Sequence, residues 1–240
     1  MKIFVPASLL CLLLVALVAP VYASITLEVL INDSFHVSLD FRNLNATMYY
    51  EIKANPEIFN STSIPRTIIG NLEKQNLKKV SWSQTSAAIF NDDEKSIHVE
   101  FYLEGLDILS YTLNKATLSR TYNAKTNWIR FDVKLTNAFT LDFATYFDTP
   151  ISMWQRINYT VNGNVHSAFY YNSTAGAAPF DASCYFILPT TALNINAIRD
   201  TLTFEMPPLL EDKLIGSPIL ILGAIIIVNI VVIVYRKVRK

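Results

Sequence analysis

Cysteine, histidine and glycine are scarce in this 240-residue chain, and each shortage excludes certain kinds of protein. Of the 2 cysteines, only Cys184 lies in the polar middle of the chain, so an intramolecular disulfide cannot hold that region together. Cys184 stands in an apolar run, which predicts a buried, unreactive thiol. The 3 histidines show no zinc-ligand spacing, and we expect no metal or other cofactor.

The 6 glycines form no phosphate-binding loop and no Gly-x-Ser-x-Gly turn, which leaves carboxylates as the remaining catalytic candidates. Asp132, Asp142 and Asp148 lie on or beside expected strands, with aromatic residues near them in the sequence. A glycosidase needs two acids that face each other across a cleft, and no sequence feature brings two of these together. The acidic loop 91–94 reads as a polar hairpin tip, with calcium binding as its alternative. We therefore expect a protein that is not an enzyme.

Charge is absent from one long stretch of the chain, between Leu214 and Tyr235. A helix over residues 214–235 would be about 33 Å long, enough to cross a hydrocarbon core of about 30 Å. We therefore predict a single C-terminal transmembrane helix. Asn229 is its only strongly polar side chain at depth, and an amide in hydrocarbon seeks a hydrogen-bond partner. That partner lies either on a neighbouring helix, in a homo-oligomer or a membrane complex, or in the same helix.

Basic residues follow this segment and set its expected direction. Arg236, Lys237, Arg239 and Lys240 crowd into residues 236–240, and short basic flanks stay on the cytoplasmic side. The residues before the helix then lie outside the cell or in a lumen. The sequence thus predicts a single-pass type I protein of the plasma membrane or an endomembrane, with the lipid bilayer as its first partner.

The N-terminal residues 1–23 read as a secretory signal peptide. Lys2 precedes an apolar run over residues 7–18, and small residues end the segment before Ser24. If the segment were retained as an anchor instead of being cleaved, the middle of the chain would still be translocated. Both readings therefore give the same topology.

Residues 24–206 form the expected extracytoplasmic domain, and residues 207–213 a short juxtamembrane stalk. Residues 24–213 hold 15 basic and 20 acidic side chains, a net charge of about −5, which argues against nucleic acid as a partner. Five asparagines in Asn-x-Ser/Thr sequons are candidate glycosylation sites. They are Asn32, Asn45, Asn60, Asn158 and Asn172.

Two-residue alternation of apolar side chains is the main structural signal in this domain, and it is typical of strands with one face on a core. The alternating runs are residues 25–31, 35–41, 97–103 and 129–135. His36 and His98 take the outward positions of two such runs. The pair Asn162-Gly163 predicts a tight hairpin. We predict a mainly β fold, an antiparallel β-sandwich of roughly ten to twelve strands.

Helical spacing interrupts the expected strands. Residues 66–80 carry apolar side chains three and four positions apart, with lysines between them, which predicts one short helix. Residues 192–199 are a weaker candidate for a second short helix.

The sequence favours a binding, adhesion or structural module at the membrane surface that contacts a protein or glycan partner. The chain has 12 Tyr, 14 Phe and 3 Trp, and such aromatic residues are enriched at interfaces. The first alternative is an accessory subunit of a multi-subunit membrane complex, in which Asn229 contacts another helix. The second alternative is a membrane-anchored carbohydrate-active enzyme.

Overall fold

The computed structural model describes residues 23–60, 62–77, 79–84, 86–173, 180–208, 222–223, 225–229 and 235. Among these residues, no helix is both long enough and apolar enough to cross a membrane. The signal segment before Ala23, most of the expected span 214–235 and the basic residues 236–240 lie outside the described residues. Ala23, the last residue of the expected signal, is the first residue of a strand.

The prediction of a mainly β fold is confirmed, with fourteen strands in three sheets within the described part of the chain. The strands of the large sheet are, in order, β10 (Gln155–Val161), β11 (Asn164–Ser173), β12 (Phe180–Ile187), β1 (Ala23–Ile31), β2 (Phe35–Arg42), β5 (Ser96–Glu104) and β3 (Ser81–Gln84), and β4 (Ile89–Asn91) also pairs with β5. The four-stranded sheet contains β13 (Leu193–Ile198), β14 (Thr201–Met206), β7 (Arg120–Lys125) and β6 (Leu109–Leu113). The two-stranded sheet pairs β8 (Asp132–Lys134) with β9 (Thr140–Asp142).

One strand pair breaks the predicted antiparallel pattern. β1 and β12 run parallel, with Leu27 opposite Cys184, so the prediction of a wholly antiparallel domain is wrong. The chain leaves the large sheet after β5, forms β6 and β7 of the four-stranded sheet and then the two-stranded sheet, and returns through β10 and β11 before it reaches β12. No tight turn joins β12 to β1, and therefore no local geometry requires the two strands to run in opposite directions.

The alternation over β1, β2 and β5 is confirmed, because every second side chain of these strands is buried. Burial of each such side chain contributes about 1.5–3 kcal/mol to folding. The buried members are Ile25, Leu27, Val29, Ile31, Phe35, Val37, Leu39, Phe41, Ile97, Val99, Phe101 and Leu103. Cys184 is fully buried on β12, and burial raises the pKa of its thiol, as expected for an unreactive cysteine.

The helix predicted over residues 66–80 exists but lies nearer the N-terminus, as α3 (Ser63–Lys74). Pro65 is tolerated in the first turn, where backbone N–H groups have no intrahelical partner. The helix ends because Asn76 adopts a positive φ of 63° and the Leu77 amide turns back to the carbonyl oxygen of Leu72 at 3.0 Å.

A second helix was not predicted. α2 (Ala46–Ala54) begins after Asn45, whose Oδ1 accepts a hydrogen bond from the Met48 amide at 2.8 Å. An asparagine at this position is a helix-start signal that the sequence does contain. In contrast, the predicted helix over 192–199 is wrong, because β13 occupies these residues and pairs with β14 across a turn at Arg199.

The run 129–135 was predicted as one strand and is only partly one. A 3₁₀ turn, η1 (Asn127–Ile129), precedes the three-residue strand β8. Trp128 and Ile129 are adjacent and both are buried, because the 3₁₀ turn directs both side chains into the core and not to opposite faces, as a strand would. Trp128 packs against Phe35 at 5.4 Å between ring centroids, so the turn covers the inner face of the large sheet.

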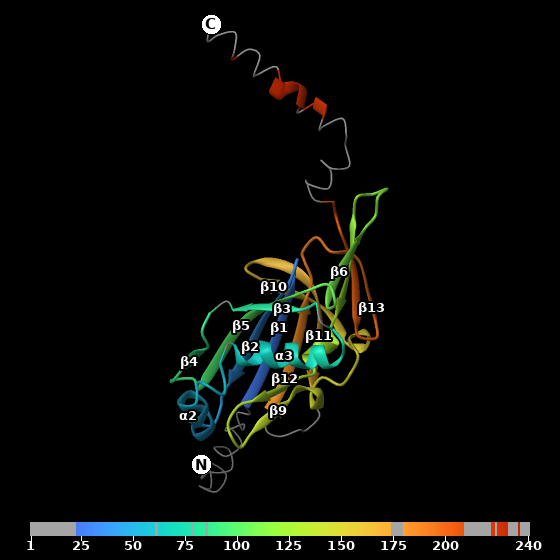
Figure 1. The fold of residues 1–240 in the computed structure, drawn as a ribbon. Coiled ribbons are helices and arrows are strands. Elements are labelled where there is room, and N and C mark those ends of the chain that lie inside the picture. The colour runs from blue at the N-terminus through green and yellow to red at the C-terminus, as the bar shows by residue number, and fades with distance from the viewer. Residues whose placement is uncertain are drawn as a thin grey trace, which may run out of the picture.

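The elements stack into layers around one hydrophobic core. Figure 1 shows α3 lying across the strands of the large sheet. Two further 3₁₀ turns, η2 (Phe143–Thr145) and η3 (Ile151–Met153), belong to the same covering layer, and η3 contacts β13 and β14. The hairpin β6–β7 projects at the end where the chain leaves β14 (Figure 1).

The predicted hairpin at Asn162-Gly163 is confirmed, with φ of 49° and 80° at the two residues.

Candidate functional site

The core-facing side of the four-stranded sheet continues past the core and becomes a surface. Opposite residues on β6, β7 and β14 form successive rungs across this face, and the β6 residues of the two outer rungs are exposed. The rungs are Leu109, Ala124 and Leu202, then Tyr111, Tyr122 and Phe204, then Leu113, Arg120 and Met206. The first rung is buried, whereas Tyr111 in the second is 50% exposed and Leu113 in the third is 44% exposed.

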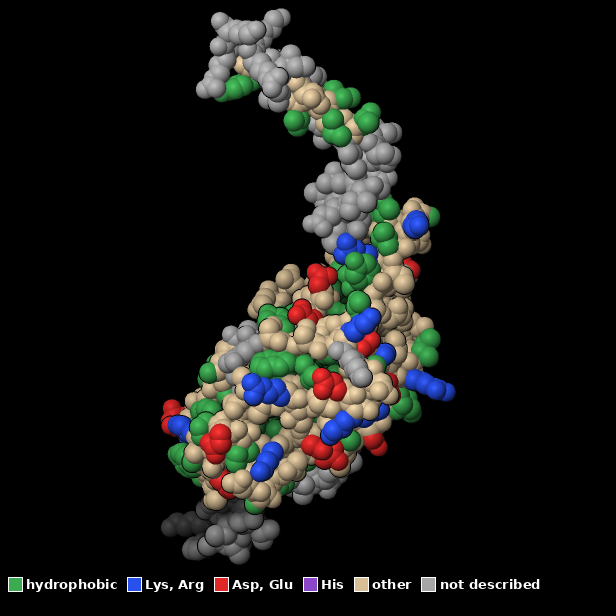
Figure 2. Space-filling model, viewed as in Figure 1, with side chains coloured by type: hydrophobic (Ala, Val, Ile, Leu, Met, Phe, Trp, Pro, Cys, Tyr) green, Lys and Arg blue, Asp and Glu red, His purple; other side chains and the backbone are tan. Residues whose placement is uncertain are grey.

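A groove of about 640 Å³ lies over these outer rungs. We call it the distal groove and define it by six of its lining residues. They are Asp33, Glu104, Leu106, Tyr111, Arg120 and Tyr122. Figure 2 shows hydrophobic side chains gathered at the projecting end of the molecule, next to basic and acidic ones. Exposed aromatic and apolar side chains beside charged groups occur in many binding sites.

Aromatic rings form a continuous stack along one wall of the distal groove. Tyr122 stacks on Phe204, with centroids 5.2 Å apart and planes within 3°, and Tyr111 lies 5.4 Å from Tyr122. The guanidinium of Arg120 lies 4.9 Å from the centre of the Tyr111 ring. This packing holds Tyr111 and Arg120 in place before any partner arrives, which reduces the entropy lost on binding.

The polar groups of the distal groove carry both signs of charge. Tyr122 donates its hydroxyl hydrogen to Oδ1 of Asp33 at 3.2 Å, and burial raises the pKa of this phenol, which therefore stays neutral. Arg120, Asp33 and Glu104 give the groove a guanidinium and two carboxylates around its apolar floor. No motif or spacing in the sequence singles out these residues. The available signal was the alternation of Leu109, Tyr111 and Leu113. This alternation does not reveal which of the three side chains the rest of the protein buries and which it leaves exposed.

The two histidines on the outer face of the large sheet lie where the sequence predicted, but they are not freely solvated. His36 and His98 side chains are 28% and 30% exposed. His98 Nδ1 lies 2.9 Å from Oδ1 of Asp40, and its Nε2 lies 3.1 Å from Oε1 of Glu100. Burial opposes the charged imidazolium, but the hydrogen bonds and charges of the two carboxylates outweigh it and raise the pKa of His98.

The ion triad of His98, Asp40 and Glu100 predicts that the free energy of unfolding falls as the pH rises. The folded-state pKa of His98 lies above the unfolded value of 6.5. The stabilisation from the charged His98 is therefore complete below about pH 6.5 and is lost as the pH passes the folded-state pKa. We expect thermal unfolding of the wild-type chain to occur at a higher temperature at pH 6 than at pH 9. His98→Gln should remove much of this difference, and an unchanged difference would show that the triad does not stabilise the fold.

The hairpin β10–β11 closes over this outer face and leaves a hollow of about 410 Å³. The Tyr159 hydroxyl donates to Oε1 of Glu28 at 2.5 Å, and burial together with this carboxylate raises the pKa of the phenol.

Within the described part of the chain, no group of three or more histidine, cysteine or acidic side chains is arranged to hold a metal ion.

The structure brings two of the three predicted carboxylates together. Asp132 and Asp142 are direct cross-strand partners on β8 and β9. Partial burial and the neighbouring Asp142 carboxylate, with which it shares a hydrogen bond, raise the pKa of Asp132. Asp148 has different neighbours, because its side chain accepts a hydrogen bond from the Thr149 hydroxyl and its carbonyl oxygen one from Arg130. No sequence pattern predicts this pair, since β8 and β9 are only three residues long.

The acidic loop 91–94 forms the tip between β4 and β5, as the hairpin reading predicted. Asp92 accepts hydrogen bonds from the Lys53 ammonium and the Tyr49 hydroxyl, both at 2.6 Å, and these bonds lower the pKa of its carboxyl group. The carboxylate of Asp92 therefore fastens α2 to this hairpin.

The candidate glycosylation sites differ in access. The asparagines at four sequons are exposed, namely Asn32, Asn45, Asn158 and Asn172. Asn60 is half-buried, and both ends of its amide are engaged. Its Oδ1 accepts from the amides of Thr62 and Ser63, and its Nδ2 donates to the carbonyl oxygen of Pro56 at 2.7 Å.

Asn229, the predicted contact within the apolar segment, is among the described residues. Its Nδ2 donates to the carbonyl oxygen of Ile225 at 2.8 Å, one helical turn earlier. This bond is the within-helix alternative of the sequence analysis. The Oδ1 atom of the same amide is an acceptor that a neighbouring helix could use.

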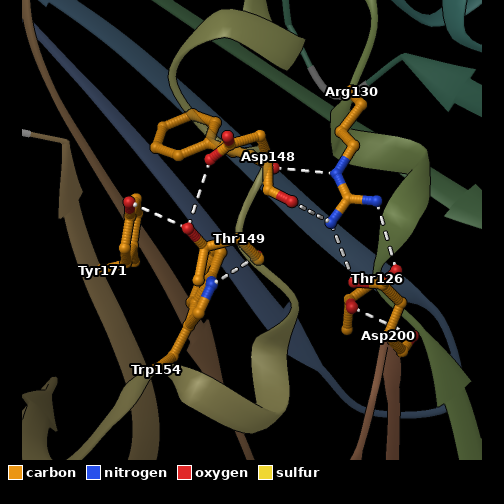
Figure 3. A network of polar contacts seen from close by, with 8 residues as sticks. Thr126, Arg130, Asp148, Thr149, Trp154, Tyr171 and Asp200 are labelled. Atoms are coloured by element: carbon orange, nitrogen blue, oxygen red, sulfur yellow. Dashed lines mark hydrogen bonds and ion pairs between the residues drawn. The ribbon is translucent and has the colours of Figure 1, made fainter. Parts of the chain in front are cut away.

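Arg130 joins three parts of the chain (Figure 3). Its Nη1 and Nη2 donate to the two carboxylate oxygens of Asp200 at 3.1 and 2.9 Å. Its Nε and Nη2 also donate to the carbonyl oxygens of Phe147 and Asp148, at 2.8 and 3.0 Å. The Thr126 amide donates to the carbonyl oxygen of Asp200, so the turn between β13 and β14 is held from two sides.

The same network continues to the large sheet. Trp154 donates its indole N–H to the carbonyl oxygen of Thr149 at 2.9 Å, and the Thr149 hydroxyl bonds the hydroxyl of Tyr171 on β11 at 3.0 Å (Figure 3). Through these contacts the covering layer ties the four-stranded sheet to the large one.

Comparison with known protein families, curated proteins and solved structures finds no match.

Proposed function

We propose that this protein is a single-pass type I membrane protein whose β-sandwich domain binds a partner polypeptide through the distal groove. The uncharged segment 214–235 and the basic residues after it support the tether and its direction. The observation that carries the binding function is the uncovered end of the core-facing sheet. There Tyr111 is 50% exposed and Leu106 is 65% exposed, beside the guanidinium of Arg120.

The backbone beside the groove supports a polypeptide as the partner rather than a glycan. β6 is the last strand of its sheet among the described strands, so its outer backbone groups have no sheet partner there. An extended segment can add to such an edge and place alternate side chains in a neighbouring groove. The two carboxylates, Asp33 and Glu104, together with Arg120, offer ion pairs that would fix its register.

The test is co-purification of partners with the full-length chain from native membranes in mild detergent. Tyr111→Ser and Leu106→Ser remove exposed groove side chains, and Ile89→Ser is the matched control, because Ile89 is 57% exposed on β4, away from the groove. Since a central aromatic contact contributes about 2 kcal/mol or more, we expect a roughly thirtyfold loss of affinity for Tyr111→Ser and none for the control. Equal retention by all three variants would refute the proposal. Competition by free oligosaccharide would make the partner a glycan.

The position of the groove favours a partner that is itself held at the membrane, as in the accessory-subunit reading. The groove shares Tyr122 and Arg120 with a smaller hollow that Met206 also lines, and Met206 ends the strand that leads toward residues 214–235. If a helix contact contributes as well, Asn229→Leu should weaken co-purification further. The carboxylate pair does not favour a glycosidase, because Asp132 and Asp142 are neighbours on one two-stranded sheet and do not face each other across a cleft.

A further inference from the structure

The β6–β7 hairpin tip lies beside the point where the chain leaves the domain. A hollow of about 390 Å³ brings this tip, the start of β13 and the exit of the chain together. Its lining residues include Asn114, Thr117, Leu193, Pro207 and Pro208. Figure 1 shows the hairpin projecting at this same end.

The tip presents apolar groups and one cation to its surroundings. Leu113 and Leu193 are 44% and 57% exposed, and the neighbouring Lys115 and Ala116 are also exposed. A small apolar surface with a lysine that can reach toward headgroups suits the interface of a bilayer.

Bonds within the hairpin satisfy part of the backbone of the tip. The Leu118 amide donates to the Asn114 carbonyl oxygen at 2.7 Å, and the Asn114 amide donates to the Ser119 carbonyl oxygen at 2.9 Å. Oδ1 of Asn114 accepts from the Ala116 amide at 3.0 Å. Each such internal partner lowers the cost of bringing the tip against an apolar medium, and backbone groups without one can stay in the hydrated headgroup layer.

The length of the tether brings the bilayer within reach of the tip. Only residues 209–213 separate Pro208 from the expected membrane span. Five residues extend at most about 18 Å, and the headgroup layer takes up part of that distance. The end of the domain that contains Pro208 must therefore lie at the bilayer surface.

We propose that the β6–β7 hairpin tip, residues 113–118, together with Leu193, docks into the headgroup–acyl boundary of the membrane that anchors the chain. The occupant of this apolar end is a lipid surface, and the inference rests on the proposed membrane tether. Docking fixes the orientation of the domain and directs the distal groove along the plane of the membrane.

The test places an environment-sensitive label on the full-length chain in phosphatidylcholine vesicles. Ala116→Cys marks the tip and Asp93→Cys marks the exposed β4–β5 turn as the matched control. Cys184 is fully buried, and the unsubstituted chain reports any labelling of native thiols. We expect nitroxide-bearing lipids to quench the label at position 116 several-fold more than the label at position 93. Leu113→Asp should abolish that difference.

Vesicle flotation after an alkaline wash separates the two ways in which this inference can fail. If the chain floats with the vesicles and the two labels are quenched equally, docking is wrong and the tether stands. If the label at position 116 shifts its emission without lipid quenching, protein covers the tip and docking is again wrong. If the chain does not float, the tether of the proposed function is wrong, and docking fails with it.

Discussion

Gly105→Ala is expected to destabilise the domain by about 3 kcal/mol or more, or to prevent folding. Gly105 has a φ of +144°, a conformation that L-residues rarely adopt. An added Cβ would lie 2.8 Å from Val80 Cα and overlap the carbonyl group of Lys79, neither of which can rotate away. Overpacking and backbone strain each cost about 1–3 kcal/mol. Chemical unfolding of the full-length chain in mild detergent measures the change.

Gly70→Ala is the matched control and should act in the opposite direction. Gly70 lies inside α3, and a Cβ built there meets no atom within 4 Å. Alanine is favoured over glycine in a helix by up to about 1 kcal/mol, so the domain should become slightly more stable. Similar losses for the two substitutions would contradict the local geometry described for Gly105.

Arg130→Ala is expected to cost about 2–4 kcal/mol. The substitution leaves the Asp200 carboxylate without its bidentate partner and removes the donors to two carbonyl oxygens. Arg130 and Asp200 side chains are only 25% and 30% exposed, so water replaces the lost bonds poorly. Because Asp200 lies in the turn before β14, we also expect weaker partner binding by the distal groove.

Arg156→Ala serves as the control for charge and size. Arg156 is exposed on β10 and makes a 3.4 Å contact with the Ser167 hydroxyl. Its loss should change the free energy of unfolding by about 0.5 kcal/mol or less. If Arg130→Ala were equally mild, the contacts in Figure 3 would not tie the sheets together.

The sequence was most informative where one face of a strand lies on the core. In β1, β2 and β5 the alternation is regular because each strand has one buried and one outward face, so pattern and structure agree. The hairpin at Asn162-Gly163 was equally predictable, since its positive φ angles favour these residue types. Both signals are local and need no knowledge of the remaining chain.

The features that escaped prediction depend on contacts between distant segments. The parallel pairing of β1 with β12 is decided by the path of the whole chain. Trp128 and Ile129 are both buried because a 3₁₀ turn takes the place of the predicted strand. The composition of this segment does not reveal whether it forms a turn or a strand. α2 carries the weak signal of a single capping asparagine, which competes with the strand-forming tyrosines that follow.

The candidate site was hidden for the same reason. Tyr111 and Leu113 continue the alternation that begins with buried Leu109. Which of these side chains is buried depends on how far the packing against the rest of the domain extends along β6. Asp132 and Asp142 were noticed as acids, yet their pairing requires the register of two short strands. Sequence patterns identify a core face well but do not show where that face emerges as a surface.

The most direct measurement is site-specific photo-crosslinking in native membranes. A photoreactive phenylalanine analogue at position 111 of the full-length chain should form a discrete adduct with a partner polypeptide, and Arg120→Glu should suppress the adduct. The same analogue at position 89, which is similarly exposed on β4, should form none. If positions 111 and 89 give the same adducts, or neither reacts with protein, the distal groove is not the binding surface.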